Sequence, residues 1–316
     1  MIHLAGALLI DKPAGPTSHD VVAVVRRALR TDRAGHTGTL DPLATGLLIV
    51  LVGSATRLAQ FLAADEKEYV ADVRLGMATA TYDASGLEPQ SAWREAPLVP
   101  EFTEAQIDAV LERFRGTFLQ TPPPYSAKKI GSVPAYEKAR RNQPVDLKPV
   151  AVSVRELELL EASPIDDRPT AIPRCGLVRL RVAAAAGFYV RSLAHDIGQA
   201  LGCGAHLERL RRTRVGRFRI EDALTLDRLE SEGAARLTSP NDLLGHMPAV
   251  GANDDGVRRI AHGNPIGPVH MEQGGARLLP TGAAVPFLRV VDGAGRLIAV
   301  AEPRGGGILQ PIVVLR

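Results

Sequence analysis

Several segments of the chain place apolar residues at every second position or in short apolar runs, and these are expected to be strands. The clearest is 68–75, where Tyr69, Ala71 and Val73 alternate with other residues. Side chains two residues apart on a strand point to the same face, so these three are expected to share one side of a sheet. The other segments that fit a strand are 7–10, 152–159 and 178–182.

Other segments show helical spacing. Ser18 is a predicted N-cap, followed by apolar residues at positions 21, 22, 25 and 29. Ser54 is expected to cap a second, short helix. Thr103 and Gln106 have the form of a capping box ahead of apolar positions 107, 110, 111 and 114. A further helix is predicted over 192–201.

Strands and helices interleave without strict strand–helix–strand repetition, which predicts a mixed α+β sheet and not a doubly wound one. The Pro-rich segment 120–125 is expected to be an extended surface loop, and 163–173 a loop insertion. From about residue 248 short strands alternate with Gly and Pro, as in 285–291 and 297–301. This change in pattern predicts a small, β-rich C-terminal domain.

The length of 316 residues fits one large domain, or a large domain with a small one beside it. The two cysteines, Cys175 and Cys203, form no CxxC pair, which indicates a reducing compartment. The N-terminus lacks the basic region of a signal peptide, and no uninterrupted apolar stretch is long enough to cross a membrane. We therefore expect a soluble, cytoplasmic protein.

The net charge is only +3, but the basic residues are clustered. Any one cluster could be a solvated face, whereas three clusters near the motifs described below favour a phosphate-rich partner, most simply a nucleic acid. The first cluster has six arginines and no acid between positions 209 and 219. The other two comprise Arg26, Arg27, Arg30 and Arg33, and Lys128, Lys129, Lys138, Arg140 and Arg141.

The sequence contains no phosphate-binding Gly-Lys-Ser/Thr loop, no GxGxxG after a strand, no metal-binding HExxH and no GxSxG nucleophile turn. These absences predict chemistry without a nucleotide cofactor or a metal. Segment 35–48 offers a carboxylate instead. Asp41 lies there among Gly38, Thr37, Thr39 and Pro42, directly before an apolar run. A carboxylate held in a tight loop on a rigid, buried support is a candidate for catalysis.

Four stretches, in this order, resemble the TruB-type tRNA pseudouridine synthases. They are Leu-Ile-Asp-Lys-Pro-Ala-Gly-Pro-Thr-Ser at 9–18, the 35–48 segment, Gln-Thr-Pro-Pro-Pro-Tyr-Ser-Ala-Lys-Lys at 120–129, and Gly-Phe-Tyr-Val-Arg-Ser-Leu-Ala-His-Asp-Ile-Gly at 187–198 with its continuation to Thr213. The resemblance covers about residues 6–245. It implies a catalytic domain over 1–247, with a largely antiparallel mixed sheet, and a small PUA-like domain over 248–316, where the likeness is weak.

The resemblance implies that the enzyme converts uridine 55 of the tRNA T-arm to pseudouridine, with no cofactor and after flipping the base out of its stack. Asp41 matches the essential carboxylate, Tyr69 the active-site tyrosine and Arg191 the active-site arginine. A guanidinium beside a carboxylate lowers its pKa, so Arg191 is expected to keep Asp41 ionised. The residues themselves leave open whether Asp41 attacks covalently, removes a sugar proton or stabilises positive charge.

The same resemblance gives His36 the role of filling the space that the flipped base leaves, and Leu210 that of covering the base. Segment 120–148 corresponds to an RNA-binding flap. Further expected RNA contacts are Lys12, Gly38, Thr39, Lys128, Lys129, Arg211 and Arg212. The expected partner is tRNA, and the expected form is a monomer. The chain departs from the family pattern at Ala80, where an acidic residue is usual within 79–83.

Two other functions fit parts of the pattern. A non-catalytic RNA-binding or tRNA-folding protein would share the basic clusters, but it has no need for Asp41, Tyr69 and Arg191 together. A glycosidase acting on nucleosides or sugars would use a carboxylate, but such enzymes usually need two that flank the bond. It would also leave the basic clusters unexplained.

Overall fold

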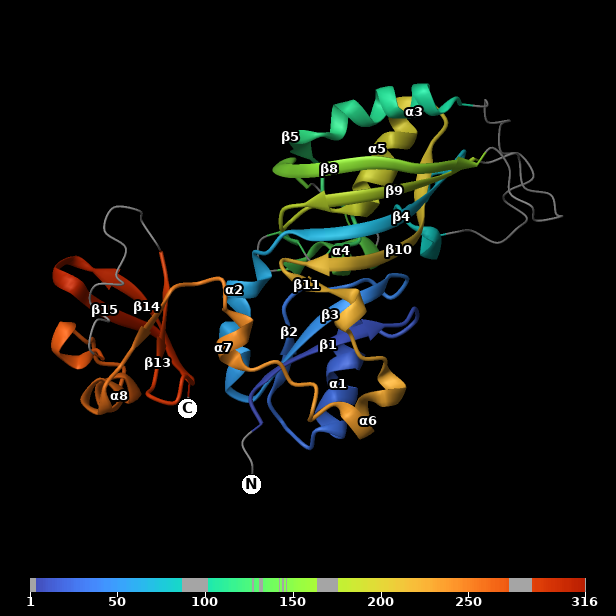
Figure 1. The fold of residues 1–316 in the computed structure, drawn as a ribbon. Coiled ribbons are helices and arrows are strands. Elements are labelled where there is room, and N and C mark those ends of the chain that lie inside the picture. The colour runs from blue at the N-terminus through green and yellow to red at the C-terminus, as the bar shows by residue number, and fades with distance from the viewer. Residues whose placement is uncertain are drawn as a thin grey trace.

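The computed structural model describes residues 4–86, 102–126, 128–130, 133–141, 143, 145, 147–163, 176–272 and 286–315. A large mixed sheet forms the body (Figure 1). Its strands are β1 (Gly6–Lys12), β2 (Ala34–His36), β3 (Thr45–Val52), β4 (Lys67–Leu75), β5 (Gly116–Gln120), β8 (Val150–Ser163), β9 (Leu177–Ala184), β10 (Ala205–Val215) and β11 (Phe218–Arg219). The four strands predicted in the body are confirmed as β1, β4, β8 and β9.

The order across this sheet is β1-β3-β10-β4-β9-β8-β5, with β2 added to β3 and β11 added to β10. All pairs are antiparallel except β10 with β3, which run parallel. The predicted mixed, largely antiparallel sheet is therefore confirmed. The parallel pair matters for function because it brings the start of β3, just after Asp41, beside the middle of β10.

Strand β3 is apolar at almost every position because both of its faces are covered. Leu48, Val50 and Val52 belong to the larger core, and Leu47 and Ile49 belong to a second core on the opposite face. This buried strand gives the preceding loop a rigid support.

Helices cover both faces of the sheet (Figure 1). Helices α1 (Ser18–Ala28), α3 (Glu104–Leu111) and α5 (Val190–Leu201) contribute to the larger core. Helix α2 (Ala59–Ala63) and helix α7 (Pro240–Leu243) contribute to the second. The shorter α6 (Leu229–Glu232) lies near α1. No helix of the described residues is long and apolar enough to cross a membrane.

The predicted helix starts are partly right. The capping box at Thr103 and Gln106 is confirmed. The predicted N-cap Ser18 is wrong, since Thr17 caps α1 in a reciprocal capping box with Asp20. The predicted cap Ser54 is also wrong: a 3-10 helix already begins at Gly53 and leads into α2 without a side-chain cap.

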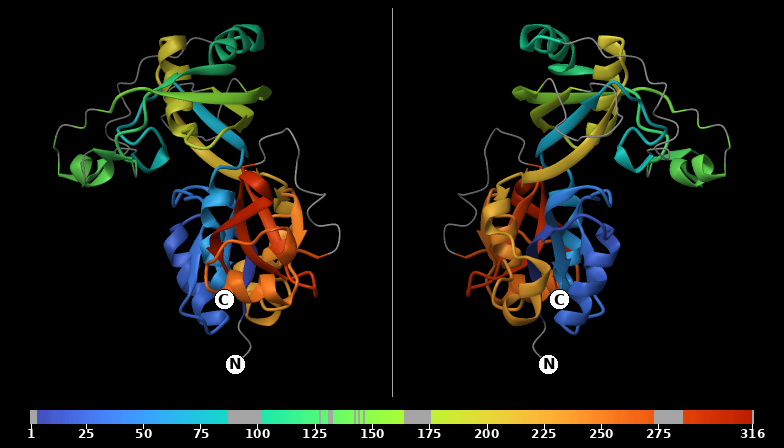
Figure 2. Two further views of the ribbon diagram at one scale, coloured as in Figure 1. Left: turned by 90° about the vertical axis from the view of Figure 1, so that its left-hand side faces the viewer. Right: turned by 90° about the vertical axis from the view of Figure 1, so that its right-hand side faces the viewer.

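Segment 121–125 is irregular, as predicted, but it is not a surface loop throughout, because Pro122 and Pro123 are buried. Beyond it lie a short hairpin, β6 (Lys129–Ile130) and β7 (Val133–Pro134), and helix α4 (Ala135–Arg140). Figure 2 shows α4 standing away from the main sheet. Nearly all of the predicted insertion at 163–173 lies outside the described residues.

A second sheet of four described strands follows, in the order β12 (Ala249–Gly251), β13 (Leu288–Val291), β14 (Leu297–Arg304) and β15 (Ile308–Val314). Helix α8 (Asp254–Ala261) packs on it. The predicted β-rich character of the C-terminal segment is confirmed. The division of the chain into domains at residue 248 stays a prediction.

Candidate active site

Asp41 lies in the loop that joins β2 to β3, and side chains from two other elements hold this loop in place. The Ser18 hydroxyl, on α1, donates to the carbonyl of Leu40 at 3.0 Å and accepts from the Leu40 amide at 2.9 Å. The Asp41 carbonyl accepts from the amide of Ala44 at 3.0 Å. The carboxylate therefore sits on a short, closed turn directly before a buried strand.

Arg191 is the second residue of α5, and hydrogen bonds with the last residue of β5 and the residue after it hold the start of this helix. The Gln120 amide group accepts from the backbone nitrogen of Tyr189 at 2.9 Å and donates to its carbonyl at 3.1 Å. The Ser192 hydroxyl donates to the Thr121 carbonyl at 2.7 Å. Buried Gln120 thus satisfies backbone groups at a helix end that lacks a side-chain cap.

The structure brings Asp41 and Arg191 together although 150 positions separate them. Arg191 Nε lies 2.8 Å from Asp41 Oδ2, and Arg191 Nη2 donates to Asp41 Oδ1 at 3.3 Å. Two parallel contacts from a planar guanidinium fix the orientation of the carboxylate as well as its position. The Arg191 side chain is only 8% exposed, while that of Asp41 is 37% exposed. The carboxylate therefore remains open to a ligand from one side.

Asp83 completes the cluster, and the sequence reasoning missed it. Its Oδ2 lies 3.7 Å from Arg191 Nη1, which also donates to the Thr81 carbonyl at 3.2 Å. Between them Tyr82 has a positive φ of 63°, rare for a residue other than glycine, and this turn directs Asp83 inward. The stretch 79–83 drew attention only for Ala80, which proves to be exposed. The usable signal was Asp83 itself, the one carboxylate in that stretch.

Burial raises the pKa of the Asp41 carboxyl above its ordinary value, Arg191 opposes that rise, and Asp83 adds to it. Arg191 does act to lower the pKa of Asp41, as expected, but the pKa as a whole is raised and not lowered. Removing water from a carboxylate disfavours its charged form, and here that effect exceeds the attraction of one guanidinium.

Tyr69 and Leu210 lie on adjacent strands of the sheet, β4 and β10, and both belong to the larger core. Leu210 pairs with Ala71, two residues along β4 from Tyr69. They are 9% and 8% exposed. Tyr189, just ahead of Arg191, is half-buried, and burial raises the pKa of its phenol. Tyr189 was assigned no role in the sequence analysis, although its ring lies within the electrostatic reach of Asp41 and Arg191.

His36 ends β2, and its ring meets the exposed His19 ring edge-on, with the centroids 5.2 Å apart. Burial, and then the charges of His19 and Arg212, lower the pKa of His36. Its imidazole is therefore neutral at neutral pH. A neutral flat ring beside the Asp41 loop suits stacking better than ion pairing.

Several predicted RNA contacts lie elsewhere than expected. Lys12 is buried, and its ammonium donates to the carbonyl of Pro13 at 2.8 Å and to that of Pro42 at 3.5 Å. Arg212 is 2% exposed, so a phosphate contact does not fit its position. Arg211 is half-exposed and makes a two-point contact with Asp11 at 3.0 and 2.8 Å. Gly38 and Thr39 belong to the Asp41 loop.

In the flap, the Tyr125 carbonyl accepts from Arg191 Nη2 at 3.0 Å, which ties the base of the flap to the Asp41–Arg191 pair. The Lys128 side chain is exposed. Lys129 begins β6, and its side chain lies outside the described part of the structure. The amides of Tyr136 and Ala135 donate to the carbonyls of Ser126 and Lys128, which folds α4 back on the hairpin.

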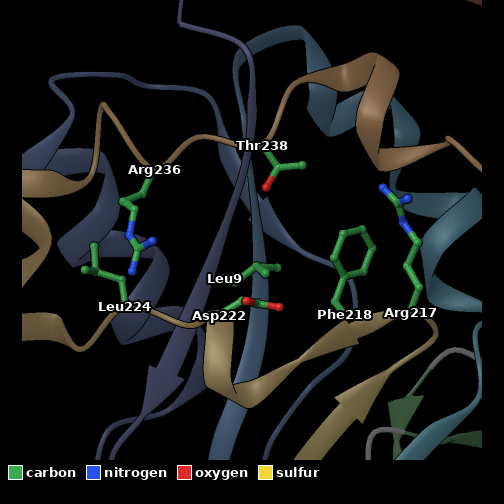
Figure 3. A pocket seen from close by; sticks show the side chains of 7 residues that line it. All are labelled: Leu9, Arg217, Phe218, Asp222, Leu224, Arg236 and Thr238. Atoms are coloured by element: carbon green, nitrogen blue, oxygen red, sulfur yellow. The ribbon is translucent and has the colours of Figure 1, made fainter.

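Two further features are separate from this cluster. A pocket of about 490 Å³, lined in part by Arg217, Phe218, Asp222 and Arg236, opens beside β1 and contains none of the predicted catalytic residues (Figure 3). No group of three or more His, Cys, Asp or Glu within the described residues could hold a metal ion.

Comparison with known proteins identifies the family. Residues 26–190 match the TruB family pseudouridylate synthase N-terminal domain, and residues 191–247 match the tRNA pseudouridylate synthase B C-terminal domain. The chain is 41% identical to tRNA pseudouridine synthase B of Solibacter usitatus, over 98% of this chain and 99% of that protein. It is 40% identical to tRNA pseudouridine synthase B of Thermobifida fusca, over 98% of each.

Solved structures agree with this result. The archaeal box H/ACA sRNP Nop10–Cbf5 complex contains a chain that superposes with a TM-score of 0.69 at 28% identity, covering 98% of this chain and 86% of that one. A chain of a Cbf5–Nop10–Gar1 complex gives a TM-score of 0.68, also at 28% identity. The chain therefore belongs to the TruB family of pseudouridylate synthases.

Proposed function

We propose that this enzyme converts one uridine of tRNA, uridine 55 in the T-arm, to pseudouridine, and that Asp41 is its essential carboxylate. The observation that carries the proposal is the Asp41–Arg191 pair, in which a guanidinium with 8% exposure holds a carboxylate that remains open on one side. The relatives from Solibacter usitatus and Thermobifida fusca, which match over nearly their full length, are both tRNA pseudouridine synthases by name.

The reaction breaks the bond between C1′ of the ribose and N1 of the base, turns the base and joins C1′ to C5. The product is an isomer of the substrate, so the reaction consumes no oxidant or energy-rich compound. The hydrogen at C5 leaves as a proton after the new bond forms, and N1, which keeps the electron pair of its broken bond to C1′, takes up a proton. A carboxylate can serve this sequence by attacking C1′, by removing a sugar proton or by stabilising positive charge on the ribose. Arg191 fixes the carboxylate for any of the three.

The base must first leave its stack, which costs a few kcal/mol. Tyr69 and Leu210, side by side on β4 and β10, provide a flat ring and an apolar side chain against which a flipped pyrimidine can lie. The neutral His36 imidazole is available to fill the space that the base leaves. The exposed Lys128 in the flap offers a charge to the RNA backbone, which positions the RNA without reading its sequence.

The direct test is chemical mapping of pseudouridine with a carbodiimide on an unmodified tRNA transcript, after incubation with the purified protein and no additive. We expect a single new mark at uridine 55. Asp41→Asn should remove that mark while RNA binding, measured by filter retention, stays close to that of the wild type. A mark of normal intensity with Asp41→Asn would contradict the assigned role. A mark at another position would contradict the proposed site in tRNA.

A further inference from the structure

Arg212 is an unusual buried cation. It is 2% exposed, and no carboxylate of the described residues lies within ion-pair distance of it. Within the part of the chain that the structure describes, the hydrogen bonds of its guanidinium are all with backbone carbonyls. Nε donates to Leu47 at 2.7 Å, Nη2 to Gly38 at 3.1 Å and Nη1 to Thr39 at 3.5 Å. A single guanidinium thus holds the backbone on both sides of Asp41.

The parallel pairing of β10 with β3 makes this reach possible. Arg212 lies opposite Gly46 in the register. A Cβ at position 46 would lie 2.3 Å from the Arg212 carbonyl oxygen, and Gly46 has a φ of 100°, so only glycine allows the two strands this approach. The guanidinium can then extend beneath the loop instead of toward solvent.

Burying the Arg212 guanidinium in this way does not favour the stability of the fold. A buried charge without a counter-ion pays for the loss of water, and carbonyl dipoles return only part of that cost. A second cation, Lys67, lies close by: its Cε and Arg212 Nη1 are each 3.6 Å from the position that a Gly38 Cβ would occupy. Burial and the charge of Arg212 lower the pKa of Lys67 to about 8. Apolar side chains would fill this space with a smaller loss of folding free energy. The guanidinium is therefore better explained by its role in fixing the backbone of the Asp41 loop.

Ser18 acts on the same loop from the opposite side. Its hydroxyl is 1% exposed and is bonded to both backbone polar groups of Leu40, the residue directly before Asp41. Ser18 comes from α1 and Arg212 from β10, so two independent elements fix one turn. The neighbouring Thr17 hydroxyl is used by the helix cap and does not contact the loop.

We propose that Arg212 and Ser18 are positioning residues, which set the place of the Asp41 carboxylate relative to Arg191 and the ribose. This inference rests on the proposed role of Asp41 in the reaction. Neither side chain touches the RNA in this assignment. Because a displacement of about 1 Å can reduce turnover by about 10²-fold, loosening the loop should lower kcat strongly while binding changes little.

The experiment uses the full chain with Arg212→Lys and Ser18→Ala. Arg212→Lys keeps the charge but replaces donors on three separate nitrogens with a single nitrogen, so it cannot reproduce the three bonds to Leu47, Gly38 and Thr39. Ser18→Ala removes both bonds to Leu40. The release of tritium from tRNA labelled at C5 of its uridines gives kcat and KM, and thermal unfolding gives the melting temperature. Rates are measured well below the melting temperature of each variant and referred to the folded fraction.

Each variant has a matched control. Arg289 on β13 also donates to backbone carbonyls, of Met247 at 2.9 Å and Asn241 at 3.3 Å, but lies in the second sheet. Arg289→Lys should therefore lower the melting temperature without lowering kcat. Thr17→Ala should do the same through loss of the helix cap. These controls distinguish a loss of thermal stability from a displacement of the Asp41 carboxylate.

We expect Arg212→Lys to reduce kcat by about 10²-fold and Ser18→Ala by on the order of tenfold, each with KM within about twofold of the wild type. If both folded variants keep the wild-type kcat and lose only thermal stability, the positioning role is overturned. If Arg212→Lys does not fold, the Ser18→Ala result decides. An unchanged rate in Asp41→Asn would instead overturn the proposed function, so the two failures are distinguishable.

Discussion

The Asp41 loop and strand β10 are both rich in features that suggest RNA chemistry, yet the structure uses them differently. The loop presents its one carboxylate to an arginine and leaves it partly open. Strand β10 carries several of the clustered arginines, and most of them are ion-paired with other residues of the protein or buried. Arg214 contacts Glu66 at 2.9 Å and Glu68 at 3.5 Å, Arg211 contacts Asp11, and Arg212 is buried. A run of like charges in one strand is therefore not in itself a binding surface, because neighbouring strands can supply the counter-charges.

The sharpest test of this difference compares two arginines. Arg191→Lys should reduce kcat by at least about 10²-fold, since an ammonium cannot hold Asp41 at two points while also reaching Thr81 and Tyr125. Arg214→Lys should leave kcat nearly unchanged, because Arg214 is paired with Glu66 and Glu68 and does not contact Asp41. Tritium release from C5-labelled tRNA measures both. Equal losses in the two variants would show that the cluster on β10 contributes to the reaction as much as Arg191 does.

The second prediction concerns the pH dependence of kcat, which the carboxylates around Arg191 are expected to set. Asp83 raises the pKa of Asp41, so Asp83→Asn should lower that pKa and move the acid limb of the kcat–pH profile to lower pH. The direction follows because the proposed role of Asp41 requires its ionised form, and removing a nearby negative charge favours ionisation. Asp292→Asn, in the turn between β13 and β14, is the control and should leave the limb in place. A limb that moves to higher pH in Asp83→Asn would mean that Asp83 mainly orients Arg191.

The third prediction returns to the basic residues. Lys128 is exposed in the flap and free to meet a phosphate, whereas Arg214 is held by two carboxylates. Lys128→Gln should raise KM more than it lowers kcat, and should flatten the dependence of log affinity on log salt by about 0.7. Arg214→Gln should leave the slope unchanged. Titrations of labelled tRNA at several salt concentrations give both values, and a reversed order would place the RNA over β10.

The fold and the centre of the site could be predicted from the sequence to different degrees. Alternation at 68–75 indicated β4 because half-buried strands follow a period of two, and the apolar run at 47–52 indicated a buried, rigid support behind Asp41. Burial inside the site was harder to predict. Lys12 and Arg212 are hydrophilic residue types, and their burial beside the loop follows from strand pairing, because β1 and β10 flank β3 and place both residues opposite Gly46. The cap at Thr17 was missed for a similar reason: Ser18 is an equally good cap by type, but the loop uses its hydroxyl.

The smallest expected effect concerns Asp196, five residues beyond Arg191 on α5, which contrasts with Asp41. Burial raises the pKa of Asp196 to about 6, and unlike Asp41 it has no arginine against it among the described residues. In the unfolded chain this carboxyl ionises near pH 3.8, whereas in the folded protein it ionises only near pH 6. Above about pH 6 its burial therefore lowers the free energy of unfolding, by at most about 3 kcal/mol. Asp196→Asn should therefore raise the melting temperature by a few degrees near pH 8 and leave it unchanged near pH 4. Thermal unfolding at both values measures this. An equal gain at the two pH values would show that the substitution acts through packing and not through charge.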